Sequence, residues 1–271
     1  MFWLWATLYV LFFFQISAIF TTVYLHRAAT HKALTLNPVV ELLMRAELWL
    51  YTGIVTREWV AVHRKHHHFT DVPGDPHSPY IEGLWEIIIG NPWYYKREAG
   101  HKETIERYAK DIPRRWYDRL FLDNGLLGIV LGLGLTMGFV RWLNPGHAWW
   151  YAPALGLGLY LAQGILYILA NALINGACHA LGYKNFSNTA TNLRWVAWLS
   201  AGEGLHNNHH QFPSAGKLSM RKTEVDLGWP VIRLLRKLSL AQVKPLPEAA
   251  IARQSAEIGQ IPELAAEEVT S

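Results

Sequence analysis

Histidine is the residue type whose number and spacing in this chain could support metal chemistry. The 271 residues include 13 histidines and one cysteine. Nine histidines form four groups, namely His26 and His31; His63, His66 and His67; His179; and His206, His209 and His210. Random placement would produce the pattern His-x2-His-His roughly 0.03 times, yet it occurs twice. A single cysteine excludes sites built from several thiolates, so any metal must use other ligands, for which the histidines are available.

The spacing places most of these histidines on shared helix faces. Residues three and four apart on a helix point the same way, which applies to both His-x2-His-His groups and to Asn175 with His179. His26 and His31 lie about 140° apart around an α-helix, so that helix would have to end or unwind between them. Nine imidazoles exceed the four ligands of a structural zinc site and suit two metal ions. A pair of irons is favoured, although zinc, copper and nickel also bind imidazole.

Carboxylates near the histidines could orient them. A metal-bound histidine needs its second ring nitrogen held by a carboxylate or carbonyl. Four acids have suitable positions, which are Glu58, Asp71, Asp75 and Glu203. Each of them could equally be a helix cap or a solvated carboxylate. His68 and His77 lie outside the repeated spacing, and we expect neither to be a direct ligand.

The charge pattern predicts the elements that position these groups. Residues 1–26 contain no Asp, Glu, Lys or Arg, and twenty helical residues cross the ~30 Å hydrocarbon core of a bilayer. The charge follows the apolar run and bulky residues fill it, so we expect a retained anchor and not a cleaved signal. Residues 142–183 also lack formal charge, are interrupted at 144–147 and follow an apolar run at 125–140. This pattern predicts a hairpin of two further spans.

The polar segments predict a side of the membrane for the histidines. Residues 94–119 carry eight Lys or Arg against five acids, which by the positive-inside rule puts residues 57–123 in the cytoplasm. All four histidine groups would then face the cytoplasm from the inner membrane. Residues 33–56 and 81–95 read as amphipathic helices lying in the interface, or else as helices packed on a soluble core. The mild net charge of +4 suits anionic lipid and gives no reason to expect nucleic acid.

We therefore predict an all-α integral membrane protein with about three transmembrane helices, interfacial amphipathic helices and a cytoplasmic histidine-rich cap that holds a dimetal site. Residues 1–240 would form a single domain. Residues 241–271 are acidic and rich in alanine, and we expect them to form a flexible tail.

Three stretches resemble the histidine boxes of the membrane fatty acid desaturases. They are HRAATH at 26–31, HRKHH at 63–67 and GEGLHNNHH at 202–210. In addition, NGACH at 175–179 is similar to a fourth ligand motif of that family. The resemblance covers about residues 25–229 and is closest to the delta-9, stearoyl-CoA-like acyl-chain desaturases, including bacterial forms.

The resemblance implies an oxygen-dependent reaction that introduces a cis double bond, at the delta-9 position, into a long-chain acyl-CoA or acyl-lipid. It implies that the nine grouped histidines bind two iron ions, with Asn175 acting through water. Trp59 matches a residue that shapes the acyl tunnel, although it could equally be an interfacial packing residue. The sequence shows no cysteine pair and no dinucleotide fingerprint, so we expect electrons from a separate ferredoxin or similar carrier.

Two other functions remain open at this point. A diiron hydroxylase or ketolase of lipids or hydrocarbons would use the same scaffold and differ only in whether oxygen is returned to the substrate. A membrane metal-binding or transport protein would need polar residues inside the spans, and residues 125–140 and 148–170 offer almost none beyond Gln163. The acyl carrier and the chain length do not follow from the sequence.

Overall fold

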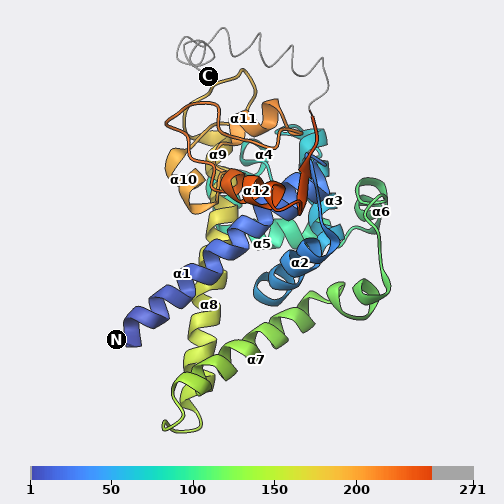
Figure 1. The fold of residues 1–271 in the computed structure, drawn as a ribbon. Coiled ribbons are helices and arrows are strands. Elements are labelled where there is room, and N and C mark those ends of the chain that lie inside the picture. The colour runs from blue at the N-terminus through green and yellow to red at the C-terminus, as the bar shows by residue number, and fades with distance from the viewer. Residues whose placement is uncertain (1, 246–271) are drawn as a thin grey trace.

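Three long apolar helical segments carry a cap of short helices at one end (Figure 1). The computed structural model describes residues 2–245. The segments are α1 (Phe2–Phe20) continued by η1 (Thr21–Thr30); α7 (Gly125–Leu143); and α8 (Tyr151–Ala172) continued by η3 (Leu173–Ala177) and α9 (Cys178–Ala180). Within the described residues these are the helices long and apolar enough to cross a membrane, which confirms the predicted single span followed by a hairpin.

The ends of α1 and α8 bring two histidine-bearing segments into the cap. The N-terminus and the α7–α8 loop both lie at the end of the molecule away from the cap (Figure 1). The α1–η1 segment is tied to its neighbours by two buried hydrogen bonds, Tyr9 to Thr136 and Thr21 to Tyr167, each 2.7 Å long. Both spans therefore deliver their C-terminal ends to the same side of the molecule.

Helix α2 (Pro38–Thr52) packs directly against α7. It begins with the Asn37 side chain accepting a hydrogen bond from the Val39 amide, which satisfies a free N–H of the first turn. A Cβ on Gly132 of α7 would collide with the Leu50 carbonyl oxygen, so the two helices approach at backbone distance. At 15 residues α2 spans only about 22 Å. It is therefore too short to cross a bilayer alone.

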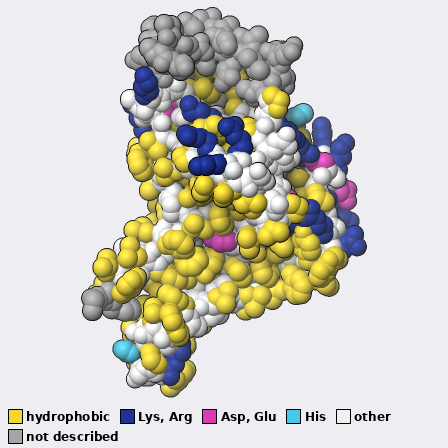
Figure 2. Space-filling model, viewed as in Figure 1, with side chains coloured by type: hydrophobic (Ala, Val, Ile, Leu, Met, Phe, Trp, Pro, Cys, Tyr) yellow, Lys and Arg dark blue, Asp and Glu magenta, His cyan; other side chains and the backbone are white. Residues whose placement is uncertain are grey.

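Helix α5 (Leu84–Ala99) is also amphipathic and leaves apolar side chains exposed. Trp85, Ile89 and Trp93 are 60–79% exposed, whereas Ile87 is fully buried. On the face shown in Figure 2, apolar side chains cover the lower helices while Lys and Arg gather higher up, over the cap. This distribution fits helices that lie at the boundary between lipid and water, as predicted for 81–95.

The cap is built from short elements. They are α3 (Thr56–Phe69), α4 (Pro79–Glu82), α6 (Lys102–Tyr108), α10 (Arg194–Leu199), α11 (His206–Gln211) and α12 (Gly228–Lys237), together with the antiparallel pair β1 (Leu34–Leu36) and β2 (Ala241–Val243), whereas the short η2 (Asp118–Leu122) lies beside the start of α7. Its main apolar cluster includes Leu25, Leu34 and Ile232. Strand β2 pairs with β1, so the fold continues beyond the boundary predicted at residue 240. The rest of the predicted tail, from 246, lies outside the described residues.

Candidate metal centre

The nine grouped histidines converge in two sets of ring nitrogens. The first set comprises His26, His31, His63, His67 and His209, and the second comprises His66, His179, His206 and His210. In each set the candidate ligand atoms all lie within 4.8 Å of one another. The four sequence groups, drawn from η1, α3, α9 and α11, thus meet in the cap as predicted.

The distances between these nitrogens match a metal coordination shell. Seven pairs of Nε2 atoms lie 2.9–3.3 Å apart, including His26 with His209 at 2.9 Å and His66 with His210 at 3.3 Å. Ligand nitrogens about 2.1 Å from one ion stand about 3.0 Å apart in octahedral and about 3.4 Å apart in tetrahedral geometry. The residues therefore fit two imidazole-bound metal ions.

A change of helix type brings His26 and His31 together. Residues 21–30 form a π-helix, in which hydrogen bonds run from i+5 to i. The His31 amide donates to the His26 carbonyl at 3.0 Å, and the two rings lie 4.8 Å apart. The helix thus widens through this segment, where the sequence had indicated that it would end or unwind. This winding places residues five apart on one side.

The two His-x2-His-His groups divide their histidines between the two sets. On α3, His63 and His67 belong to the first set while His66 belongs to the second. On α11 the division is reversed, because His206 and His210 join the second set and His209 joins the first. The shared helix face was predictable, but this division depends on how α3 and α11 face each other.

Three of the four predicted carboxylates lie against the outward ring nitrogen of a histidine. Glu203 Oε2 lies 2.6 Å from His26 Nδ1, and Asp71 Oδ2 lies 2.8 Å from His179 Nδ1. Both Asp75 oxygens lie 3.0 Å from His66 Nδ1. Such contacts favour the tautomer with the proton on Nδ1 and a lone pair on Nε2 pointing inward.

Glu58 does not join this arrangement. It pairs with Lys96, whose Nζ lies 3.4 Å from Glu58 Oε2. Glu58 and His63 are five residues apart on an ordinary α-helix, about 140° around its axis, so their side chains diverge. The suggestion that Glu58 orients His63 is therefore corrected.

Burial favours the neutral form of most of the clustered imidazoles. It lowers the pKa of six of them well below the usual value, and the neighbouring imidazoles lower it further, for His31, His63, His67, His206, His209 and His210. Burial opposes ionisation of Asp75, but His66 beside it holds the pKa of Asp75 below its usual value. Neutral imidazoles beside ionised carboxylates are the forms that bind metals.

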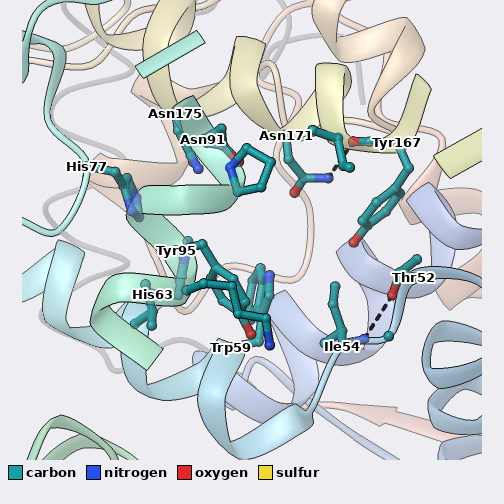
Figure 3. Close-up of a pocket in the computed structure, with 15 residues that line it drawn as sticks. Thr52, Ile54, Trp59, His63, His77, Asn91, Tyr95, Tyr167, Asn171 and Asn175 are labelled. Atoms are coloured by element: carbon teal, nitrogen blue, oxygen red, sulfur yellow. Dashed lines mark hydrogen bonds between the residues drawn. The ribbon is translucent and has the colours of Figure 1, made fainter. Parts of the chain in front are cut away.

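An apolar pocket of about 180 Å³ reaches the histidines from the side of α3, α5 and α8 (Figure 3). His63, Trp59 and Asn175 are among its lining residues. The Trp59 and His63 rings stack 4.8 Å apart with 11° between their planes. Trp59 therefore contacts the histidine cluster, and Asn175 lines the same pocket as His63.

His77 also lines this pocket, and the spacing argument had set it aside. Its ring stacks on His66 at 4.7 Å, and its buried Nε2 has no hydrogen-bond partner among the described residues. The only sequence signal was its place in the DPHSP stretch, two residues after Asp75. The backbone amide of His77 donates to Asp75 at 3.0 Å, which links it to the orientation of His66.

Comparisons with known proteins agree with this geometry. A family model described as fatty acid desaturase matches residues 1–233. Delta-9 acyl-lipid desaturase 2 of Arabidopsis thaliana is 31% identical over 93% of this chain and 79% of its own length. The acyl-CoA 5-desaturase of Anemone leveillei is 32% identical, covering 91% and 72%. The sn-1 stearoyl-lipid 9-desaturase of a Synechocystis strain is 34% identical, covering 73% and 58%.

Proposed function

This chain belongs to the fatty acid desaturase family, and from that premise we propose that it introduces a cis double bond at the delta-9 position of a long-chain acyl group. The reaction would use molecular oxygen and a histidine-bound pair of irons. The observation that carries the proposal is the convergence of nine imidazoles in two sets beside an apolar pocket.

The irons would be held by His26, His31, His63, His67 and His209 on one side and by His66, His179, His206 and His210 on the other, with Asn175 acting through water. When bound, they would supply oxygen activation strong enough to break unactivated C–H bonds, which no side-chain acid or base can do. Glu203, Asp75 and Asp71 would keep the imidazoles oriented. The apolar walls would exclude water and hold the methylene pair in place.

The pocket supports an acyl substrate but accommodates only part of one. Its volume of about 180 Å³ is below the ~300 Å³ of small ligand pockets, so it would hold the chain segment nearest the histidines. Trp59 would set the path of that segment by its stacking on His63. The relatives differ in both carrier and bond position, since their names include acyl-lipid, acyl-CoA, delta-9 and delta-5. We place this chain with the delta-9 acyl-lipid or acyl-CoA type.

The electron donor would be a separate small carrier such as a ferredoxin. The three spans fit an inner-membrane protein, and the basic segment 94–119 favours a cytoplasmic orientation of the cap. Membrane lipid would then be both the surroundings of the protein and the source of acyl chains.

The decisive experiment expresses the chain in a host that lacks delta-9 unsaturation. Double bonds and hydroxyl groups in total fatty acids are then located by mass spectrometry. We expect a cis monoene at the ninth carbon, lost in His209→Ala along with most of the bound iron. His68→Ala is the matched control, because His68 lies next to the cluster on α3 but is exposed.

Other products would change the conclusion. A hydroxylated fatty acid would indicate the alternative oxygenase, and a monoene at another carbon would correct the position. A His209→Ala protein that kept both activity and iron would remove His209 from the ligand set.

A further inference from the structure

A second hollow reaches the histidine cluster separately from the apolar pocket. Its volume is about 520 Å³, and its lining residues are His31, Arg64, His67, Thr70, Asn188, Thr189, His210 and Pro213. It shares no lining residue with the apolar pocket. The apolar pocket combines Ile54, Val62 and Ile168 with polar residues such as Asn171, whereas seven of the eight residues that line this hollow have polar or charged side chains.

The histidine cluster lies between the two hollows. His63 lines the apolar pocket, and its Nε2 lies 3.1 Å from Nε2 of both His31 and His67, which line the polar hollow. His31, His67 and His210 are partly exposed, while the remaining members apart from His63 are 0–2% exposed. Both nitrogen sets are thus open to the polar hollow, the first through His31 and His67 and the second through His210.

Desaturation, the proposed function on which this step rests, requires a second route to the histidines for protons and water. A methylene pair loses two hydrogens, and one oxygen molecule takes these, two electrons from the carrier and two protons to become two waters. The acyl chain fills the apolar pocket during this reaction. Protons and water cross apolar walls poorly, and so does a hydrated metal ion.

We propose that the polar hollow is the aqueous port of the centre. Metal ions reach the histidines through it, and during turnover protons enter and water leaves by the same route. The Thr70, Asn188 and Thr189 side chains supply hydrogen-bonding groups for water along its wall.

A reversible chemical modification that blocks the polar hollow tests this assignment on a single folded sample. Pro213 also lines the hollow, and Cys178, the only cysteine of the chain, is fully buried. In Pro213→Cys the introduced thiol is therefore the one that a hydrophilic methanethiosulfonate can reach. The reaction forms a mixed disulfide and releases sulfinate, and a phosphine reductant reverses it. Thr70→Cys provides a second lining position if Pro213→Cys does not fold.

The first readout is the rate at which a hydrophilic chelator removes iron from purified protein. We expect modification to slow this rate several-fold and reduction to restore it. With acyl substrate, kcat should fall while KM stays unchanged, because the apolar pocket is untouched. Lys237→Cys, on the exposed face of α12, is the control and should show neither effect.

Unchanged chelation and unchanged kcat after complete modification would overturn the port. A rise in KM instead would show that the hollow takes the acyl chain, which also overturns it. Unmodified protein that binds no iron would overturn the proposed function itself, so the two failures are distinguishable.

Discussion

His179 and Asp71 are 108 positions apart in the chain, yet His179 Nδ1 lies 2.8 Å from Asp71 Oδ2. The Ser78 hydroxyl donates to the other Asp71 oxygen at 2.7 Å. Asp71 comes directly after α3 and His179 stands at the end of the last span. This contact therefore joins the segment after the second histidine group to the third group and orients the His179 ring toward His206, whose Nε2 is 3.0 Å from that of His179.

We expect Asp71→Asn to weaken iron binding about 10- to 100-fold, the usual effect of losing a carboxylate behind a metal-bound histidine. Chelator competition on purified protein would measure it. Asp123→Asn is the control, because Asp123 pairs with Arg114 away from the histidines. Equal affinity in Asp71→Asn and the unmodified chain would show that the contact does not orient a ligand.

Trp59→Ala should change the product and spare the metal. The substitution opens the wall of the apolar pocket beside His63 while leaving the nine histidines in place. We expect altered bond position or chain-length preference by mass spectrometry, with iron content near that of the unmodified protein. Trp195→Ala, on the exposed side of α10, should leave the product pattern unchanged. An unaltered pattern in Trp59→Ala would make Trp59 a packing residue.

A pair of glycines on α7 tests the close approach of α2. Gly132→Ala should destabilise the protein by about 1–3 kcal/mol, because the new methyl collides with the Leu50 carbonyl. Gly134→Ala meets nothing within 4 Å and should be neutral or stabilising by up to about 1 kcal/mol. Thermal unfolding in matched detergent would compare them. Equal melting temperatures would indicate that the helices separate readily.

Glu47 on α2 should make stability depend on pH. Burial raises the pKa of Glu47 to about 8, while the Ser17 hydroxyl, which donates to it at 2.8 Å, partly opposes the rise. The folded protein then holds a proton that the unfolded chain has released, between the unfolded pKa of about 4.5 and about 8. Stability from this group is full below about 4.5 and is lost as the pH rises through this window.

Glu47→Gln removes that dependence. Melting temperatures at pH 6 and pH 8.5 should therefore differ less in Glu47→Gln than in the unmodified chain. The histidines affect the pH dependence of both proteins equally. The change in pH dependence between Glu47→Gln and the unmodified chain therefore reports on Glu47 alone. An equal or larger pH effect in the variant would contradict the assignment.

Much of the site was readable from the sequence because its signals are local. Spacing of three and four residues defines a helix face, and long uncharged runs define spans, so His63, His66 and His67 and the three spans follow without coordinates. Asp75 was also within reach, because it lies only nine positions from its partner His66.

The tertiary structure decided what local spacing cannot express. The π-helical winding between His26 and His31 depends on the packing of η1 in the cap, and the division of α3 and α11 between two nitrogen sets depends on their relative orientation. The error over Glu58, by contrast, was one of local geometry, because residues five apart on an α-helix point about 140° away from each other. Pairing of Asp71 with His179, like the separation of the polar hollow from the apolar pocket, arises only when segments distant in the chain are packed together.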